Sequence, residues 1–148
     1  MLKFNAVKRY AMIVLLLCAL PALAESPLDD AEKRLSEVKV FAFGGIGFAG
    51  QTSKGEIDFR LVLSQPSQVA LTVLEKLYAT GNPQAKTYAL FGIRKINSSR
   101  FKELLASAKA SQEKVEVMRG CIMTDDFPRD LASQIGQGKW DTWFNNRS

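Results

Sequence analysis

The stretch "PSQVALTVLEKLYATGNPQAKTYALFGIRKI", residues 66–96, decides the fold class of this 148-residue chain. Apolar side chains recur every three or four residues on both sides of "GNP", which is the spacing of one face of a helix. In the second helix this face also carries small residues such as Ala89, which would let a neighbouring helix come close. Gly81 ends the first helix, and Asn82 caps the second, whose first turn holds Pro83. Two helices joined by so short a turn predict an antiparallel hairpin packed on a common core.

The segments on either side of this stretch extend the helical pattern. Further helices are expected from Leu28, from about Lys54 to Ser64, from Ser98 or Ser99 to Ala108, and from Asp126 to Ile135. Their expected caps are Ser53, which forms a capping box with Glu56, then Ser98 or Ser99, and Asp126. Pro66, Pro83 and Arg100 are spaced evenly by 17 residues, which fits either HEAT-like hairpin repeats or a simple bundle. The predicted fold is mostly α (α+β), with antiparallel helical hairpins in a single domain over residues 25–138.

Two segments show the alternation of β-strands instead. They are "VKVFAF", Val38–Phe43, and "VEVMRGCIM", Val115–Met123. Because an isolated strand leaves its backbone groups without hydrogen bonds, the two are expected to lie side by side as a small two-stranded element. This arrangement places Cys121 in mid-strand, where a small buried side chain is the favoured interpretation.

The stretch "FGGIGFAG", Phe43–Gly50, contains the glycine spacing of a dinucleotide-binding fingerprint. Such a site also needs a second parallel strand that carries an acidic ligand for the ribose. Residues 54–96 have a helical pattern instead, so no nucleotide cofactor is expected. The glycines are interpreted as a structural turn where the first strand meets the helical layer.

The N-terminus has the features of a signal peptide over residues 1–24. A basic start is followed by the apolar "AMIVLLLCAL", residues 11–20, and by "ALA" at 22–24, so cleavage is expected before Glu25. Two alternatives are disfavoured: a lipoprotein acylated at Cys18, and a retained membrane anchor. The apolar run is too short for a stable anchor. The mature protein is expected to be periplasmic or secreted, without stable membrane insertion.

Composition excludes several classes of function. The chain has 20 basic and 15 acidic residues, and cleavage removes three basic ones, which leaves a net charge of +2 and no indication of nucleic-acid binding. The absence of histidine excludes the usual zinc sites and Ser-His or Cys-His pairs. After cleavage Cys121 is the only cysteine, so no internal disulfide can form. Neither a metal nor a cofactor is expected.

The aromatic residues near the C-terminus are candidates for partner binding. Trp140, Trp143 and Phe144 lie in a glycine-preceded tail, residues 139–148. Aromatic side chains in such a tail either dock onto the protein's own core or present a binding surface to a partner. Docking onto the core is the favoured interpretation, and binding to a partner is the alternative that would give these residues a function.

Three other residues are candidates for chemistry. Cys121 is a candidate reactive thiol, although no histidine is available to activate it. Asp125 and Asp126 could form a carboxylate pair close to the glycine turn. Capping of the following helix already explains Asp126, so the pair is a weak indication of catalysis.

Four pieces of the chain carry a family resemblance: "FAFGGIGFAGQTSKGE", "AKTYALFGIRKI", the phenylalanine at 101, and "MRGC" ending at Cys121. They resemble a family of small exported bacterial proteins, one member of which is encoded beside a microcin gene cluster. The resemblance implies that the glycine block and the Gly-Cys strand belong to one structural unit, and it suggests a link to bacterial competition. It implies no catalytic residues.

Together these features predict an exported module, not an enzyme, that binds another protein or a peptide through a helical face or the aromatic tail. The alternative is an envelope enzyme that uses Cys121 or the Asp125/Asp126 pair. A protein that binds small ligands between its helices is a third possibility.

Overall fold

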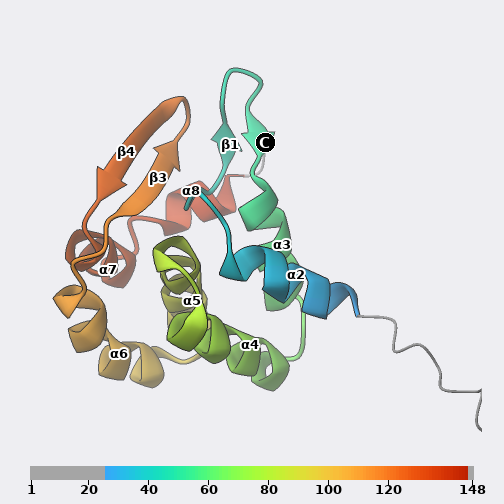
Figure 1. Cartoon of the computed structure of the whole chain (residues 1–148), viewed down its shortest axis with the longest axis vertical. Helices are drawn as coiled ribbons and strands as arrows, with labels where there is room; N and C mark the ends of the chain where they lie inside the picture. The colour runs from blue at the N-terminus through green and yellow to red at the C-terminus, as the bar shows by residue number, and fades with distance from the viewer. Residues whose placement is uncertain (1–25, 147–148) are drawn as a thin grey trace, which may run out of the picture.

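The computed structural model describes residues 26–146, in which helices pack around a core and two small β-hairpins project from one side (Figure 1). The helices are α2 (Pro27–Ser36), α3 (Lys54–Leu63), α4 (Ser67–Thr80), α5 (Pro83–Ile96), α6 (Ser98–Ala110), α7 (Pro128–Gly136) and α8 (Asp141–Asn145). The strands are β1 (Gly45–Ile46), β2 (Gln51–Thr52), β3 (Val115–Arg119) and β4 (Ile122–Asp126). The prediction of a mostly helical α+β fold is confirmed.

The predicted signal peptide, its cleavage before Glu25 and the alternative at Cys18 lie outside the described residues. Within residues 26–146, no helix is both long enough and apolar enough to cross a bilayer. The interpretation of the N-terminal segment therefore stays a prediction from the sequence.

Helix α5 is the centre of the fold, and it contacts α4, α6, α7 and β3. Its predicted face of small and apolar residues is buried, with Ala89 at 0% exposure. At Gly92 a Cβ would lie 2.8 Å from Leu74 Cδ1 and 3.0 Å from Phe59 Cε2, so glycine lets the neighbouring helices approach closely. Because α5 also contacts α7, which is distant along the chain, the helices form a bundle rather than a stack of repeats.

Two helices begin differently from the prediction. The Asn97 side chain caps α6 by accepting the Arg100 N–H at 3.0 Å, so the prediction that one of the two following serines caps this helix is wrong. Asp126 belongs to β4 and does not cap α7, which follows Phe127 with a proline in its first turn. Both helices still occupy the predicted segments.

The predicted strand Val38–Phe43 is wrong except at one residue. Phe41 forms an isolated parallel bridge with Val117, with backbone bonds of 2.8 and 3.0 Å to the two residues that flank Val117. The backbone of Ala42 bonds the Tyr88 hydroxyl instead, so no ladder continues from the bridge. The two segments do lie side by side, as expected, but only at this point.

The predicted strand Val115–Met123 is a hairpin rather than one strand. Strands β3 and β4 pair antiparallel around a turn at Gly120 and Cys121, and Gly120 adopts a φ of +58°, which favours glycine. Residues typical of strands lie on both sides of the turn, so the sequence by itself predicts a single strand. Cys121 is consequently exposed, and the interpretation of it as a buried residue is wrong.

The glycine block forms the other hairpin, β1–β2. Gly47 and Gly50 adopt φ values of +68° and +61° in its turn, which confirms the interpretation of these glycines as turn residues. The turn differs in one respect from the prediction: the chain pairs back on itself through Gln51–Thr52 before α3 begins.

Candidate functional site

The two hairpins touch each other near their tips. The Gly47 N–H donates to the Gly120 carbonyl at 3.0 Å, and the bridge between Phe41 and Val117 joins the hairpins nearer the core. Segments far apart in the sequence thus form one projecting unit (Figure 1). We call residues 41–52 and 115–126 the hairpin pair.

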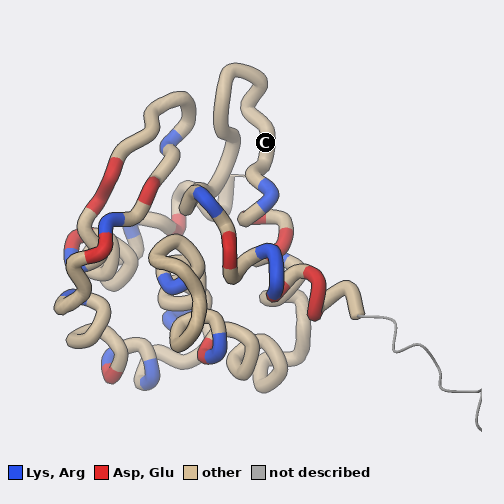
Figure 2. Tube along the Cα trace, in the orientation of Figure 1, with Lys and Arg blue, Asp and Glu red and all other residues tan. Residues whose placement is uncertain are grey.

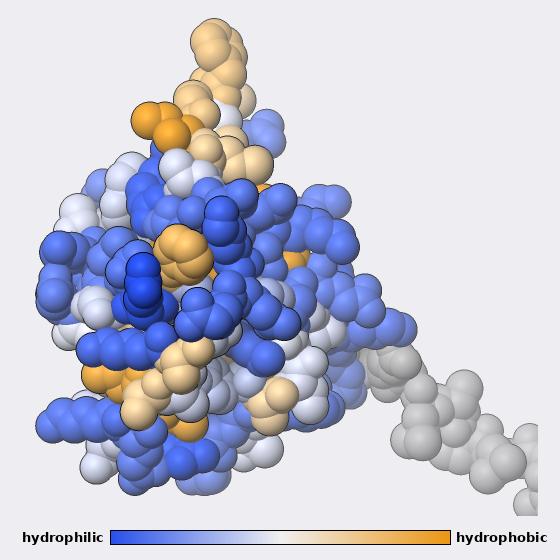
Figure 3. Space-filling model, turned by 60° about the vertical axis from the view of Figure 1, so that its left-hand side comes forward, coloured by the Kyte–Doolittle hydropathy of each residue, from blue (hydrophilic) through white to orange (hydrophobic). Residues whose placement is uncertain are grey.

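Large apolar side chains are exposed at the tips of the hairpin pair. Phe48 is 106% exposed, Ile122 67% and Met123 56%, and we call these three residues the tip patch. No charged residue occurs in segments 40–53 and 120–124, and the tips are correspondingly free of Lys, Arg, Asp and Glu in Figure 2. Figure 3 shows apolar groups gathered on this projection. Large exposed apolar side chains gathered at one end of a molecule are typical of an interaction site.

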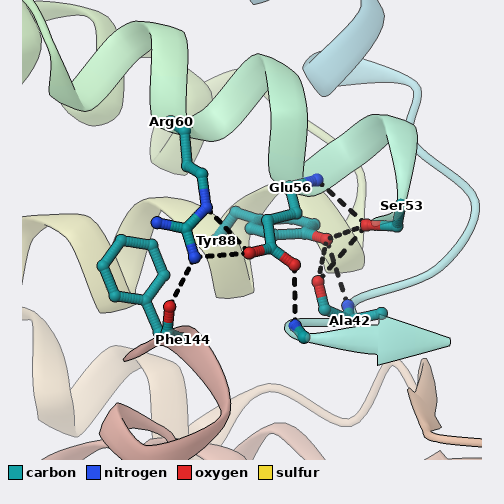
Figure 4. Close-up of polar contacts among 7 residues, drawn as sticks. Ala42, Ser53, Glu56, Arg60, Tyr88 and Phe144 are labelled. Atoms are coloured by element: carbon teal, nitrogen blue, oxygen red, sulfur yellow. Dashed lines mark hydrogen bonds and ion pairs between the residues drawn. The ribbon is translucent and has the colours of Figure 1, made fainter. Parts of the chain in front are cut away.

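A buried carboxylate fixes the base of the β1–β2 hairpin (Figure 4). Glu56, in the first turn of α3, is 2% exposed. One of its oxygens accepts the Gly44 N–H at 2.7 Å, and the other accepts two N–H groups of Arg60 at 2.8 and 2.5 Å. The Ser53 hydroxyl caps α3 at the Glu56 N–H, but the carboxylate bonds the hairpin rather than completing a capping box.

Tyr88 of α5 holds the chain just before this hairpin (Figure 4). Its buried hydroxyl donates to the Ala42 carbonyl at 2.7 Å and accepts the Ala42 N–H at 3.0 Å, so one side chain satisfies both backbone groups. Burial raises the pKa of Tyr88 from 10.0 to about 12. The phenol therefore keeps its proton, and with it this donor, at any pH near neutrality.

The C-terminal segment completes the anchor. Arg60 donates to the Phe144 carbonyl, and its guanidinium carbon lies 4.1 Å from the centre of the Phe144 ring. Trp140 is 2% exposed, and its ring lies 4.7 Å from that of Phe41. Trp143 and Phe144 are partly buried against the core. These aromatic residues dock onto the protein's own core, and Trp140 in particular has no surface to offer a partner, so residues 139–146 are no separate tail.

The candidate thiol and carboxylates lie on the β3–β4 hairpin but do not converge. Cys121 is exposed in the turn. Asp126 accepts hydrogen bonds from Arg119 at 2.6 Å and from Thr124 at 2.8 Å, and is therefore engaged within the fold. Successive residues of a strand point to opposite faces, so the carboxylates of Asp125 and Asp126 do not form the expected pair.

A cavity of about 240 Å³ lies among α4, α5, α6 and α7, where the prediction of a ligand between helices would place it. Leu90, Ala108 and Leu131 supply apolar lining, and Tyr78 and Lys86 supply polar groups. Pockets for drug-sized ligands usually measure roughly 300–1,000 Å³. The cavity is therefore a weaker candidate for a binding site than the tip patch.

No known protein family, curated protein or solved structure matches this chain. The resemblance to small exported bacterial proteins, and with it the link to bacterial competition, stays a prediction. Across residues 26–146, no cluster of His, Cys, Asp and Glu side chains is arranged to hold a metal ion.

The tip patch is the feature that the sequence analysis missed. The glycine spacing predicted the turn at Gly47, but neither the turn at Gly120 nor the apolar side chains beside the two turns were predicted. The sequence nevertheless indicates exposed apolar residues in two uncharged runs. In the first run Phe48 follows the turn glycine Gly47, and in the second Ile122 lies two residues after Gly120. Its own hairpin does not bury such a residue, because a two-stranded hairpin has no second layer.

Proposed function

We propose that this chain is an exported protein-binding module whose tip patch contacts a partner protein. The exposure of Phe48, together with that of Ile122 and Met123, carries the proposal. Burial of one such side chain stabilises a complex by roughly 1.5–3 kcal/mol, so a partner that covers the patch gains appreciably from the contact. Aromatic residues and methionine are enriched at the cores of interfaces, from which charged residues are depleted.

The anchoring of the hairpin pair also supports binding. Glu56 and Tyr88 bond the backbone at the base of the β1–β2 hairpin, and the bond between Gly47 and Gly120 ties the tips together. A surface that is ordered before association loses less conformational entropy when it binds. The tip patch therefore presents its side chains on a fixed backbone.

The N-terminal sequence supports an envelope or extracellular location for the partner. Residues 1–24 have the pattern of a signal peptide, and the net charge of +2 expected after cleavage gives no reason to invoke nucleic acid. A periplasmic extract is accordingly the place to look for the partner.

Affinity capture with the mature chain, residues 25–148, tests the proposal. The variant carries Phe48→Ser and Ile122→Ser, and the matched control carries Ile57→Ser and Val69→Ser, since those two residues are 55% and 41% exposed on the helical body. We expect the wild type and the control to capture the same protein from periplasmic extract, and the tip variant to lose it while keeping the wild-type circular dichroism spectrum. Equal capture by the tip variant would show that the tip patch is not the binding surface.

A further inference from the structure

The outer edge of β4 has no strand beside it in the described part of the chain (Figure 1). On the other side of the hairpin, Glu116 and Met118 of β3 bond Phe41 through their backbone groups. Residues of an antiparallel strand alternate between bonding one neighbour and the other, so the cross-strand partners Met123 and Asp125 direct their N–H and C=O groups outward. An open edge of this kind is a template for another strand.

The outward face of the same hairpin carries an apolar pair and an acidic pair. Met118 lies opposite Met123, and Glu116 lies opposite Asp125. Cross-strand partners project on the same face, so each pair is adjacent. Val117 points to the other face, where it is buried at 0% exposure.

The acidic pair is uncompensated within the described residues. Glu116 and Asp125 lie directly opposite each other, an arrangement of like charges that destabilises a ladder. No Lys or Arg of residues 26–146 forms an ion pair with either, whereas Asp126 on the opposite face pairs with Arg119 at 2.6 Å. A cation placed over both carboxylates relieves this repulsion.

We infer that the β4 edge binds an extended segment of the partner protein as an added strand. The segment bonds the outward backbone groups of Met123 and Asp125. It carries a lysine or arginine over Glu116 and Asp125, and an apolar residue two positions away that covers Met123 of the tip patch. In strand addition the backbone bonds supply affinity and the alternate side chains supply specificity. The inference rests on the proposed function and states the chemistry of the partner.

A second copy of this chain is a poorer occupant of the edge. Antiparallel pairing of two β4 strands about Thr124 sets Met123 of one copy against Asp125 of the other. It also doubles the number of carboxylates on the face and brings no cation to them. Charge complementarity thus favours a basic segment from a different protein.

Two short capped peptides test the inference on the mature chain. In both peptides every second residue is threonine. In the first peptide the positions between the threonines hold valine, leucine and one lysine, with the leucine and the lysine two positions apart. The second peptide has glutamate in place of the lysine. We expect the lysine peptide to bind roughly tenfold more tightly and to slow hydrogen exchange at the Met123 and Asp125 amides. Asp125→Lys should reverse the preference, and the control Glu37→Lys, at an exposed acid on the helical body, should leave it unchanged.

The outcomes separate this inference from the proposed function. Unchanged exchange at the Met123 and Asp125 amides, or an unchanged peptide preference in Asp125→Lys, overturns the inference. If capture of a partner still depends on the tip patch in that case, the proposed function stands alone. Dimerisation of the chain with protection at the same amides also overturns the inference, because the occupant is then a second copy. The exchange measurement uses the wild-type protein, so it does not depend on the folding of any variant.

Discussion

The helical body and the hairpin pair are stabilised in different ways. In the body, apolar side chains face inward at helical spacing, and the Phe59 ring of α3 lies 6.0 Å from the Phe91 ring of α5. At the tips of the hairpin pair the large apolar side chains lie in solvent, with Phe48 at 106% exposure, and buried hydrogen bonds to Glu56 and Tyr88 hold the β1–β2 hairpin at its base. Stability should therefore depend on the body and the anchor, while substitutions at the tips should leave it nearly unchanged.

The largest effect is expected at the anchor itself. Glu56→Ala leaves the Arg60 guanidinium and the Gly44 N–H without their acceptor in a mostly buried site. Loss of one partner from such a network should lower the free energy of unfolding by about 2–4 kcal/mol, because Arg60 keeps some access to water. Urea denaturation measures the change.

The matched control is Glu75→Ala, which removes a carboxylate that pairs with Arg100 on the surface at 42% exposure. It should cost less than about 1 kcal/mol. Equal losses in the two variants would mean that the network around Glu56 anchors nothing.

Alkaline pH should weaken the Tyr88 anchor next. Burial raises the pKa of this phenol from 10.0 to about 12, so the unfolded chain releases its proton first. The protonated Tyr88 phenol contributes its full stabilisation below about pH 10, and this stabilisation is lost as pH rises through about 12. The free energy of unfolding should fall by roughly 2–3 kcal/mol over this range. The difference between the wild type and Tyr88→Phe in urea denaturation should shrink over this window.

Leu131→Ala is the control for that titration, because it removes a buried apolar side chain of the helical body and no titratable group, and it leaves Tyr88 in place. Its difference from the wild type should stay constant between pH 10 and 12. A constant difference for Tyr88→Phe as well would show that Tyr88 ionises at the same pH in the folded and unfolded chain.

Overpacking of the helical body should have a somewhat smaller effect. Ala89 is 0% exposed on the central helix α5, so Ala89→Leu forces extra methylene groups into a filled space. The free energy of unfolding should fall by about 1–3 kcal/mol, and the denaturation midpoint should fall with it. The same substitution at the exposed Ala106 of α6 should leave the midpoint within experimental error; a similar fall there would attribute the loss to helix propensity rather than to packing.

The smallest effect is expected at the tips. Cys121→Ala changes an exposed side chain in the β3–β4 turn and should alter the free energy of unfolding by less than about 0.5 kcal/mol. A thiol reagent should modify Cys121 in the native protein without changing the melting temperature. A loss of more than about 1 kcal/mol would indicate that Cys121 is packed, as the sequence alone suggests.

The sequence by itself determined the helical elements. The periodicity of residues 66–96, the caps at Ser53 and Asn82, and the small face of α5 are local signals, because each depends on side chains one or two turns apart. The glycine turn at Gly47 was also predictable, since a positive φ favours glycine wherever the residue lies in the fold.

Only the tertiary structure decided where the polar and exposed groups went. Glu56 satisfies a local capping rule in sequence but bonds Gly44 in space, and Cys121 fits a strand pattern but lies in a turn. Residues typical of strands lie on both sides of this two-residue turn, so the sequence does not reveal where the chain reverses. Exposure of Phe48 likewise depends on whether another layer covers the hairpin, and that is settled by contacts between segments far apart in the chain rather than by neighbouring residues.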